Sequence, residues 1–185
     1  IKKKRSFKIP KKKILRNYLE ATTNKKVDII VELIGGAEGP AKKLVFAGLK
    51  NGKHVVTANK ALIAKYGDDL SKIAEKNKVN LEFEAAVCGG VPVLRSIKEG
   101  LTANKIYKVK GILNGTSNYI LTSMDKDNIT FKEALLNAKQ LGYAEAKPTS
   151  DINGEDVSSK LKILSSLSFN SFINNNISVE GISQI

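Results

Sequence analysis

The chain of 185 residues lacks most of the features that mark secreted and membrane proteins. Cys88 is its one cysteine, which excludes an intramolecular disulfide framework. No apolar run reaches the length that spans a bilayer, and no signal-peptide pattern begins the chain. Because 42% of the residues are hydrophobic, the chain can bury a real core. We therefore expect a globular cytoplasmic protein with no membrane partner.

Acidic residues are absent from the first 13 positions, where eight of the basic residues lie. The net charge of +13 admits two interpretations: a lysine-rich solvated surface with one basic connector, or a basic nucleic-acid-binding module centred on residues 1–26. Elsewhere lysine alternates with acidic residues, and no arginine-rich or aromatic-interleaved stripe occurs. We expect the first interpretation and hence no nucleic-acid partner. Salt-dependent binding to random duplex, lost on deletion of residues 1–13, would support the second.

The first half of the chain alternates between strand and helix patterns. Short apolar runs predict strands, and apolar residues at helical spacing predict helices between them. The expected strands are 27–34, 54–57 and 79–86, and the expected helices are about 40–52 and 61–77, after weaker signals for a strand at 7–9 and a short helix at 11–19. This alternation predicts an α/β fold with a parallel sheet. Ligands bind at the carboxyl ends of such strands, where Asn59 and Lys60 follow the second one.

After residue 90 the pattern changes, and we place a domain boundary there. Helices are expected at 92–101, through 119–121 after a polar turn at 114–116, at 131–141 and across 157–167, with a strand at 105–113 and a polar loop at 143–153. Asp156 and Lys160 are four residues apart, so they share one helix face, and Glu145 and Asp151 lie on the preceding loop, which could fold over that face. Such a cluster suits a substrate with an ammonium group and a reactive oxygen. It is equally the pattern of an ordinary helix ion pair with Asp151 near the N-cap.

Four segments, in order and at consistent spacing, resemble motifs of the homoserine dehydrogenase family. They are VVTANKALIA at 55–64, EAAVCGGVPV at 84–93, GILNGTSNYIL at 111–121 and LGYAEAKPTSDINGEDVSSKL at 141–161. The resemblance implies reversible hydride transfer between NAD or NADP and a small amino acid, in which L-aspartate 4-semialdehyde is reduced to L-homoserine on the way to threonine and methionine. It implies an incomplete Rossmann-type parallel sheet over residues 1–90, followed by an α+β catalytic domain over residues 91–185 through which the family forms homodimers.

The resemblance also assigns roles to individual positions. Lys160 matches the proposed proton donor to the carbonyl oxygen, and Lys60 matches a second lysine near the nicotinamide and the substrate. The other matched positions bind substrate (Gly115, Thr116, Tyr143, Glu145, Asp151 and Asp156) or cofactor (Lys60, Gly142 and Glu145). Main-chain carbonyls at four further positions match a site for a monovalent cation, sodium or potassium: Glu84, Val87, Gly89 and Val91.

The sequence departs from the family pattern in two ways. No GxGxxG motif is present, so we expect a fragment that lacks the start of the nucleotide-binding fold and is inactive on its own. Lys147 stands where the family usually has Asp, next to Ala146 and Pro148. An inactive dimerising fragment and a related amino-acid dehydrogenase remain alternatives, and the sequence does not distinguish NAD from NADP.

Overall fold

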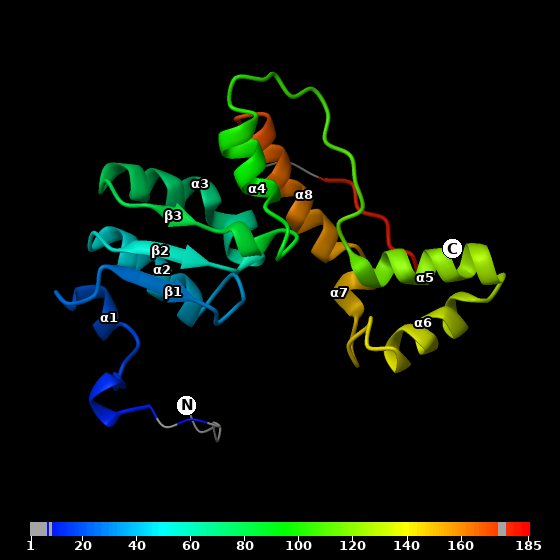
Figure 1. The fold of residues 1–185 in the computed structure, drawn as a ribbon, viewed down its shortest axis with the longest axis horizontal. Coiled ribbons are helices and arrows are strands. Elements are labelled where there is room, and N and C mark those ends of the chain that lie inside the picture. Colours follow the sequence, from blue (N-terminus) through cyan, green and yellow to red (C-terminus); the bar gives the residue numbers. More distant parts are fainter. Residues whose placement is uncertain (1–6, 8, 174–176) are drawn as a thin grey trace.

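Figure 1 shows the computed structural model of the chain, which describes residue 7, residues 9–173 and residues 177–185. A parallel sheet backed by helices forms one part of the molecule. A second part, made of helices, projects from it, and a long helix near the end of the chain joins the two. No helix in the described part of the chain combines the length and the apolar character needed to cross a membrane.

The sheet has three parallel strands in the order β1-β2-β3, which are Ile29–Glu32, His54–Thr57 and Leu81–Glu82. Helices α2 (Pro40–Lys50) and α3 (Lys60–Lys76) connect them, as predicted. The α/β fold class with a parallel sheet is confirmed, although β1 and β3 are shorter than the predicted strands. β1 ends at Glu32 because the next free backbone N–H groups donate to the Glu32 side chain. After β3 the chain turns into a 3-10 helix, η2 (Glu84–Ala86), instead of continuing as a strand.

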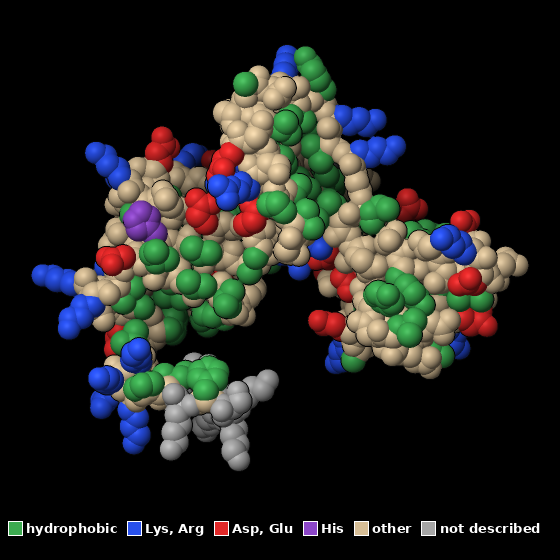
Figure 2. All heavy atoms as spheres, viewed as in Figure 1, with side chains coloured by type: hydrophobic (Ala, Val, Ile, Leu, Met, Phe, Trp, Pro, Cys, Tyr) green, Lys and Arg blue, Asp and Glu red, His purple; other side chains and the backbone are tan. Residues whose placement is uncertain are grey.

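One face of the sheet packs against α2 and α3. Ile30 and Val55 point into this layer and are buried, and Gly48 of α2 permits the close approach, since a Cβ there would lie 2.9 Å from the Ile30 Cδ1 atom. Residues of the opposite face stay open to solvent: Ile29 and Val31 are 58% and 61% exposed. Hydrophobic side chains therefore gather on the sheet side of the molecule in Figure 2.

The second half is helical, in the order α4 (Val93–Arg95), η3 (Ser96–Gly100), α5 (Gly115–Asp127), α6 (Phe131–Gln140), α7 (Thr149–Ile152) and α8 (Glu155–Ser168). The helices predicted after residue 90 are present, and α7 is an extra turn in the predicted loop. α5 and α6 form a hairpin around Ile120, Ala134 and Ala138, and a Thr130–Glu133 capping box begins α6. α8 instead packs against α3, because Ile163 and Leu164 belong to the core of the sheet part.

The strand predicted at 105–113 is wrong. This segment is an extended connection that runs away from the sheet in Figure 1, with Tyr107 80% and Ile112 74% exposed. A strand needs a neighbour to pair its backbone groups, and no strand within residues 9–173 or 177–185 lies beside it. The alternating pattern is therefore present without the pairing that would make it a strand.

The N-terminal segment also differs from the prediction. In place of a helix over 11–19, a single 3-10 turn, η1 (Lys11–Lys13), is followed by the short α1 (Glu20–Thr23). Pro10 precedes that turn and the exposed lysines have no apolar partner to hold a longer helix. Residues 1–6 and 8, which hold part of the basic run and of the weak strand signal, lie outside the described residues.

Candidate active site

A buried carboxylate joins the two parts of the molecule. Asp156, in the first turn of α8, is 5% exposed. Its Oδ1 lies 2.8 Å from the Nζ of Lys60, the first residue of α3, and its Oδ2 lies 2.7 Å from the Nζ of Lys160, one turn along α8. The structure thus brings together both lysines predicted as catalytic, although they are far apart in sequence.

Lys160 is held in place by two acceptors. Besides Asp156, its Nζ donates to the carbonyl oxygen of Leu113, at 2.7 Å, at the end of the segment that leads into α5. An ammonium group has three N–H donors, so these two bonds orient the third. The side chain is 17% exposed, so the oriented donor lies at a partly desolvated position.

Asn114 links the carboxylates. Its Nδ2 donates to Asp151 Oδ1 at 2.8 Å and to Asp156 Oδ2 at 2.9 Å, while its Oδ1 caps α5 by accepting from the N–H of Ser117. The Ser117 hydroxyl donates to the Asp151 carbonyl oxygen, which ties α7 to α5 a second time. Asp151 therefore enters the cluster through Asn114, not through a lysine.

The cluster keeps Asp156 ionised. Burial by itself raises the pKa of the Asp156 carboxyl, but hydrogen bonds from Lys160, Lys60 and Asn114 outweigh it, and the pKa lies below its ordinary value. The carboxylate is therefore an acceptor only, and both ammonium groups are held on one anion. This arrangement provides a fixed proton donor beside a fixed negative charge.

The predicted pocket residues lie around the start of α5. Gly115 and Thr116 form its first turn, and the Thr116 hydroxyl donates to the carbonyl oxygen of Tyr143 at 2.6 Å. The Tyr143 ring stacks on Tyr119, with ring centroids 4.6 Å apart. Gly142 precedes it with a φ of +79°, a conformation that favours glycine and turns the chain after α6. Gly115 follows Asn114 of the lysine cluster directly, and the Thr116 hydroxyl ties Tyr143 to the same helix start.

Glu145 is not part of this cluster in the structure. Its side chain is exposed, and it makes no hydrogen bond or ion pair with another described residue. Lys147, the unusual residue of the motif, is also exposed. The reversed charge at Lys147 is thus solvated and leaves the contacts of Asp156 intact, while a substrate or cofactor role for Glu145 stays a prediction.

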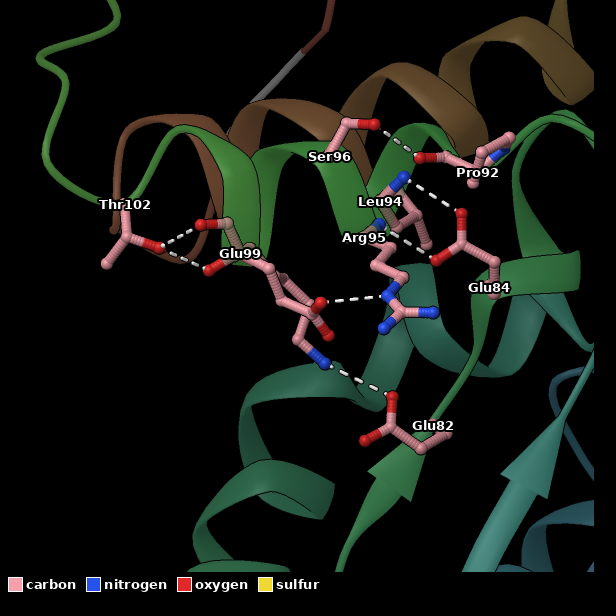
Figure 3. A network of polar contacts seen from close by, with 9 residues as sticks. Glu82, Glu84, Pro92, Leu94, Arg95, Ser96, Glu99 and Thr102 are labelled. Carbon is pink, nitrogen blue, oxygen red and sulfur yellow. Dashed lines mark hydrogen bonds and ion pairs between the residues drawn. The ribbon is translucent and has the colours of Figure 1, made fainter.

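The predicted cation loop is closed by its own first residue. Glu84 Oε1 and Oε2 accept the N–H groups of Leu94 and Arg95, at 3.0 and 2.9 Å, so this carboxylate caps α4 from across the loop (Figure 3). An ion pair between Glu82 and Lys98, at 3.2 Å, ties β3 to η3 beside it. Within the loop, the carbonyl oxygens of Val87 and Gly89 accept no hydrogen bond from a described residue.

Sequence reasoning missed two residues of this region. The pattern around Asn114 predicts only a polar turn, and its position before an expected helix is the one signal that marks it as a cap. The pattern around Glu32 predicts only a buried strand, yet its carboxylate accepts the Thr57 hydroxyl at the end of the next strand, three residues before Lys60. A single acidic residue inside an apolar run is the signal that could have drawn attention to it.

Comparisons with known proteins agree with this geometry. Residues 92–185 match the family model for homoserine dehydrogenase, and residues 1–84 match the model for the homoserine dehydrogenase NAD binding domain. The chain is 45% identical to the homoserine dehydrogenase of Neisseria gonorrhoeae and 44% identical to that of Bacillus subtilis. These matches cover 95% and 100% of this chain but 40% and 43% of the relatives, so the chain spans about two fifths of their length.

Solved structures give the same result. A homoserine dehydrogenase from Thiobacillus denitrificans superposes with a TM-score of 0.86 at 48% identity, over 92% of this chain and 39% of that one. A hyperthermophilic archaeal homoserine dehydrogenase in complex with NADPH superposes with a TM-score of 0.76 at 32% identity, over 84% of this chain and 48% of that one. With both halves matched in sequence and the fold matched in space, this chain belongs to the homoserine dehydrogenase family.

Proposed function

We propose that this chain supplies the substrate-binding and proton-transfer residues of an NAD(P)-dependent homoserine dehydrogenase, which interconverts L-aspartate 4-semialdehyde and L-homoserine. The observation that carries the proposal is the Lys160 ammonium, held by Asp156 and the Leu113 carbonyl with one N–H left to donate. Family membership favours this function over a nucleic-acid-binding module or a structural fragment.

The proton chemistry follows from that geometry. When the aldehyde carbon accepts a hydride, its oxygen becomes an alkoxide, and Lys160 donates the proton that makes it the hydroxyl of homoserine. In the reverse direction the same nitrogen takes the proton back as the hydride leaves. Asp156 stabilises the ammonium form of Lys160, because the pKa of the Asp156 carboxyl lies below its ordinary value and the group is an anion beside that nitrogen.

The remaining residues of the cluster bind the ends of the amino acid. Asp151 donates nothing, and its Oδ2 has no partner among the described residues, so it can accept from the substrate ammonium group. Lys60 is 43% exposed, which leaves it able to attract the substrate carboxylate while it contacts Asp156. Gly115, Thr116, Tyr143 and Glu145 would line the rest of the pocket.

The cofactor, NAD or NADP, supplies or takes up the hydride when it is bound. The match of residues 1–84 to an NAD binding domain and the NADPH complex of an archaeal relative support this choice. The carboxyl end of β1 fits such a ligand: Gly35 and Gly36 both have positive φ, and the space beside the Gly35 Cα is open. Lys60, Gly142 and Glu145 would border the nicotinamide.

Three further assignments belong to the proposal. Residues 1–90 would form part of a nucleotide-binding domain and residues 91–185 a catalytic domain, since the two family models meet between residues 84 and 92. The carbonyls of Glu84, Val87, Gly89 and Val91 would hold a sodium or potassium ion, for which the unpaired oxygens of Val87 and Gly89 are suitable ligands. A homodimer would cover exposed Tyr107 and Ile112.

The test is homoserine oxidation by the full-length protein that contains this chain, with NAD and NADP assayed separately. Lys160→Ala should lower kcat by about 10²- to 10⁴-fold, the usual contribution of a positioned general acid. Lys162→Ala, on the same helix, is the matched control, because Lys162 lies over the Phe172 ring and not at Asp156. An unchanged kcat in a folded Lys160→Ala variant would rule out the assigned proton donor.

A further inference from the structure

Glu32 is a buried carboxylate that the proposed chemistry does not use. Its side chain is 0% exposed at the end of β1. Among the described residues it forms no ion pair, in contrast to Asp156 with its two lysines. A buried charge without an ion pair is costly unless hydrogen bonds compensate for the lost water. The donors around Glu32 therefore have to supply those hydrogen bonds.

Those donors come from two neighbouring strand ends. Glu32 Oε1 accepts the N–H groups of Ile34 and Gly35, at 2.6 and 3.0 Å. Glu32 Oε2 accepts the Thr57 hydroxyl, at 2.6 Å, from the end of β2. Burial raises the pKa of the Glu32 carboxyl, but these hydrogen bonds outweigh it and the pKa lies below its ordinary value. Glu32 is therefore charged and can only accept.

That charge fixes the direction of a chain of hydrogen bonds. Because Glu32 only accepts, the single Thr57 hydroxyl proton points at it, which leaves Thr57 Oγ1 to accept the N–H of Asn59, at 3.0 Å. The Asn59 side chain then accepts the N–H of Leu62 as the N-cap of α3, at 3.1 Å, and donates to the Gly36 carbonyl oxygen, at 2.7 Å. Both ends of the Gly35-Gly36 turn are thereby tied to Glu32.

The chain of bonds ends next to the candidate active site. Lys60 follows Asn59 directly and is the first residue of the helix that Asn59 caps. Its Nζ lies 2.8 Å from Asp156. A shift in the start of α3 would move this nitrogen away from Asp156 and from the substrate.

We infer that Glu32 is a positioning residue: through Thr57 and Asn59 it fixes the start of α3, and so places Lys60 against Asp156. The inference rests on the proposed function. Glu32 itself touches neither substrate nor the reacting atoms; it acts on catalysis through the position of Lys60.

The experiment is a double-mutant cycle of Glu32→Gln and Lys60→Ala in the full-length protein, with homoserine oxidation measured at saturating cofactor. The Glu32→Gln change keeps the shape of the side chain but replaces one acceptor oxygen with an NH₂ group. An NH₂ group cannot accept a hydrogen bond, so the donors that face it lose their partner. Glu32→Gln alone should lower kcat/KM for homoserine by about 100-fold, the scale of an ångström-sized misplacement. In the Lys60→Ala background it should cost less than about threefold, because the residue it positions is gone.

A second pair of variants applies if Glu32→Gln does not fold. Thr57→Val removes the hydroxyl that joins the two strand ends and should reproduce the loss, whereas Thr57→Ser keeps the hydroxyl and should restore near-normal kcat/KM. Losses that multiply fully with Lys60→Ala, or a Thr57→Ser variant as impaired as Thr57→Val, would overturn the inference. If Lys160→Ala keeps full activity, the proposed function itself fails, and that result is separate from the outcome of the cycle.

Discussion

The end of β1 and the start of α8 each bury one carboxylate, and the two are stabilised by opposite means. At Glu32 the donors are neutral: two backbone N–H groups and a hydroxyl. At Asp156 two ammonium groups and one amide surround the charge. Neutral donors fix a local backbone shape, whereas lysines are long side chains that can turn toward another anion. The first arrangement therefore suits a scaffold, and the second suits a site that binds a charged substrate.

The largest difference between the two carboxylates is expected when the anion that the two lysines share is removed. Asp156→Asn should lower kcat by about 100-fold or more, because Lys160 loses the partner that orients its donor. It should also destabilise the fold by about 3 kcal/mol, the lower end for a broken buried pair, since Lys60 is 43% exposed and can reach water. Turnover and urea unfolding measure the two effects.

Glu155→Gln is the control for that variant, as Glu155 is the exposed acidic neighbour on α8. It should leave both turnover and unfolding close to the original values. Full activity in Asp156→Asn would show that the lysine pair is structural only.

Acid unfolding should separate the two carboxylates. Both have a pKa below the ordinary value in the folded protein, so the unfolded chain binds more protons in acid. Their stabilisation is complete above the ordinary pKa and is lost as the pH falls through the folded one. The unfolding free energy should therefore drop below about pH 4.5 for Glu32 and below about pH 3.8 for Asp156.

Glu32→Gln should flatten the upper part of that acid profile and Asp156→Asn the lower part. High salt should lower the contribution of Asp156 to the free energy of unfolding more than that of Glu32. Salt screens ion pairs, and Glu32 has no cationic partner among the described residues. Urea unfolding across the acid range at two ionic strengths provides the measurement. Equal salt sensitivity of both contributions would contradict the distinction between them.

The smallest expected effect concerns Glu84, a half-buried carboxylate whose donors are neutral, like those of Glu32, and are backbone N–H groups only. Glu84→Gln keeps one acceptor for α4 and loses the other, so it should cost about 1 kcal/mol, as for the loss of a helix cap. Glu99→Gln, which removes only the surface pair with Arg95, is the control and should change the midpoint of unfolding less. A larger effect from Glu99→Gln would show that the cap is unimportant.

Local patterns were enough to predict the sheet and most helices. The run from β2 into α3 combines a short apolar strand with helical spacing, and the Asp156–Lys160 pair follows from a separation of four residues on one helix. Both kinds of signal lie within a few residues of each other. They survive in the structure because the core between the sheet, α3 and α8 supports them.

What could not be predicted depends on contacts between distant segments. The strand at 105–113 has the right pattern but no partner, and pairing is decided by what lies beside a segment. Asn114 reaches Asp151 and Asp156 across 37 and 42 residues, and no spacing rule links them. The prediction for exposed Glu145 depends on its motif and on its place in the polar loop, and neither says where a loop directs a side chain.

The meeting of three elements at Asp156 also has a mechanical consequence. Lys60 of α3, Asn114 at the start of α5 and Asp156 of α8 touch at a single point, while the α5–α6 hairpin extends away from it. Any rotation of the hairpin about this point would displace its far end, near Asn128, the most, and would leave the distances among the three side chains almost unchanged. The side chains of the candidate site therefore lie where such a rotation would change their distances least.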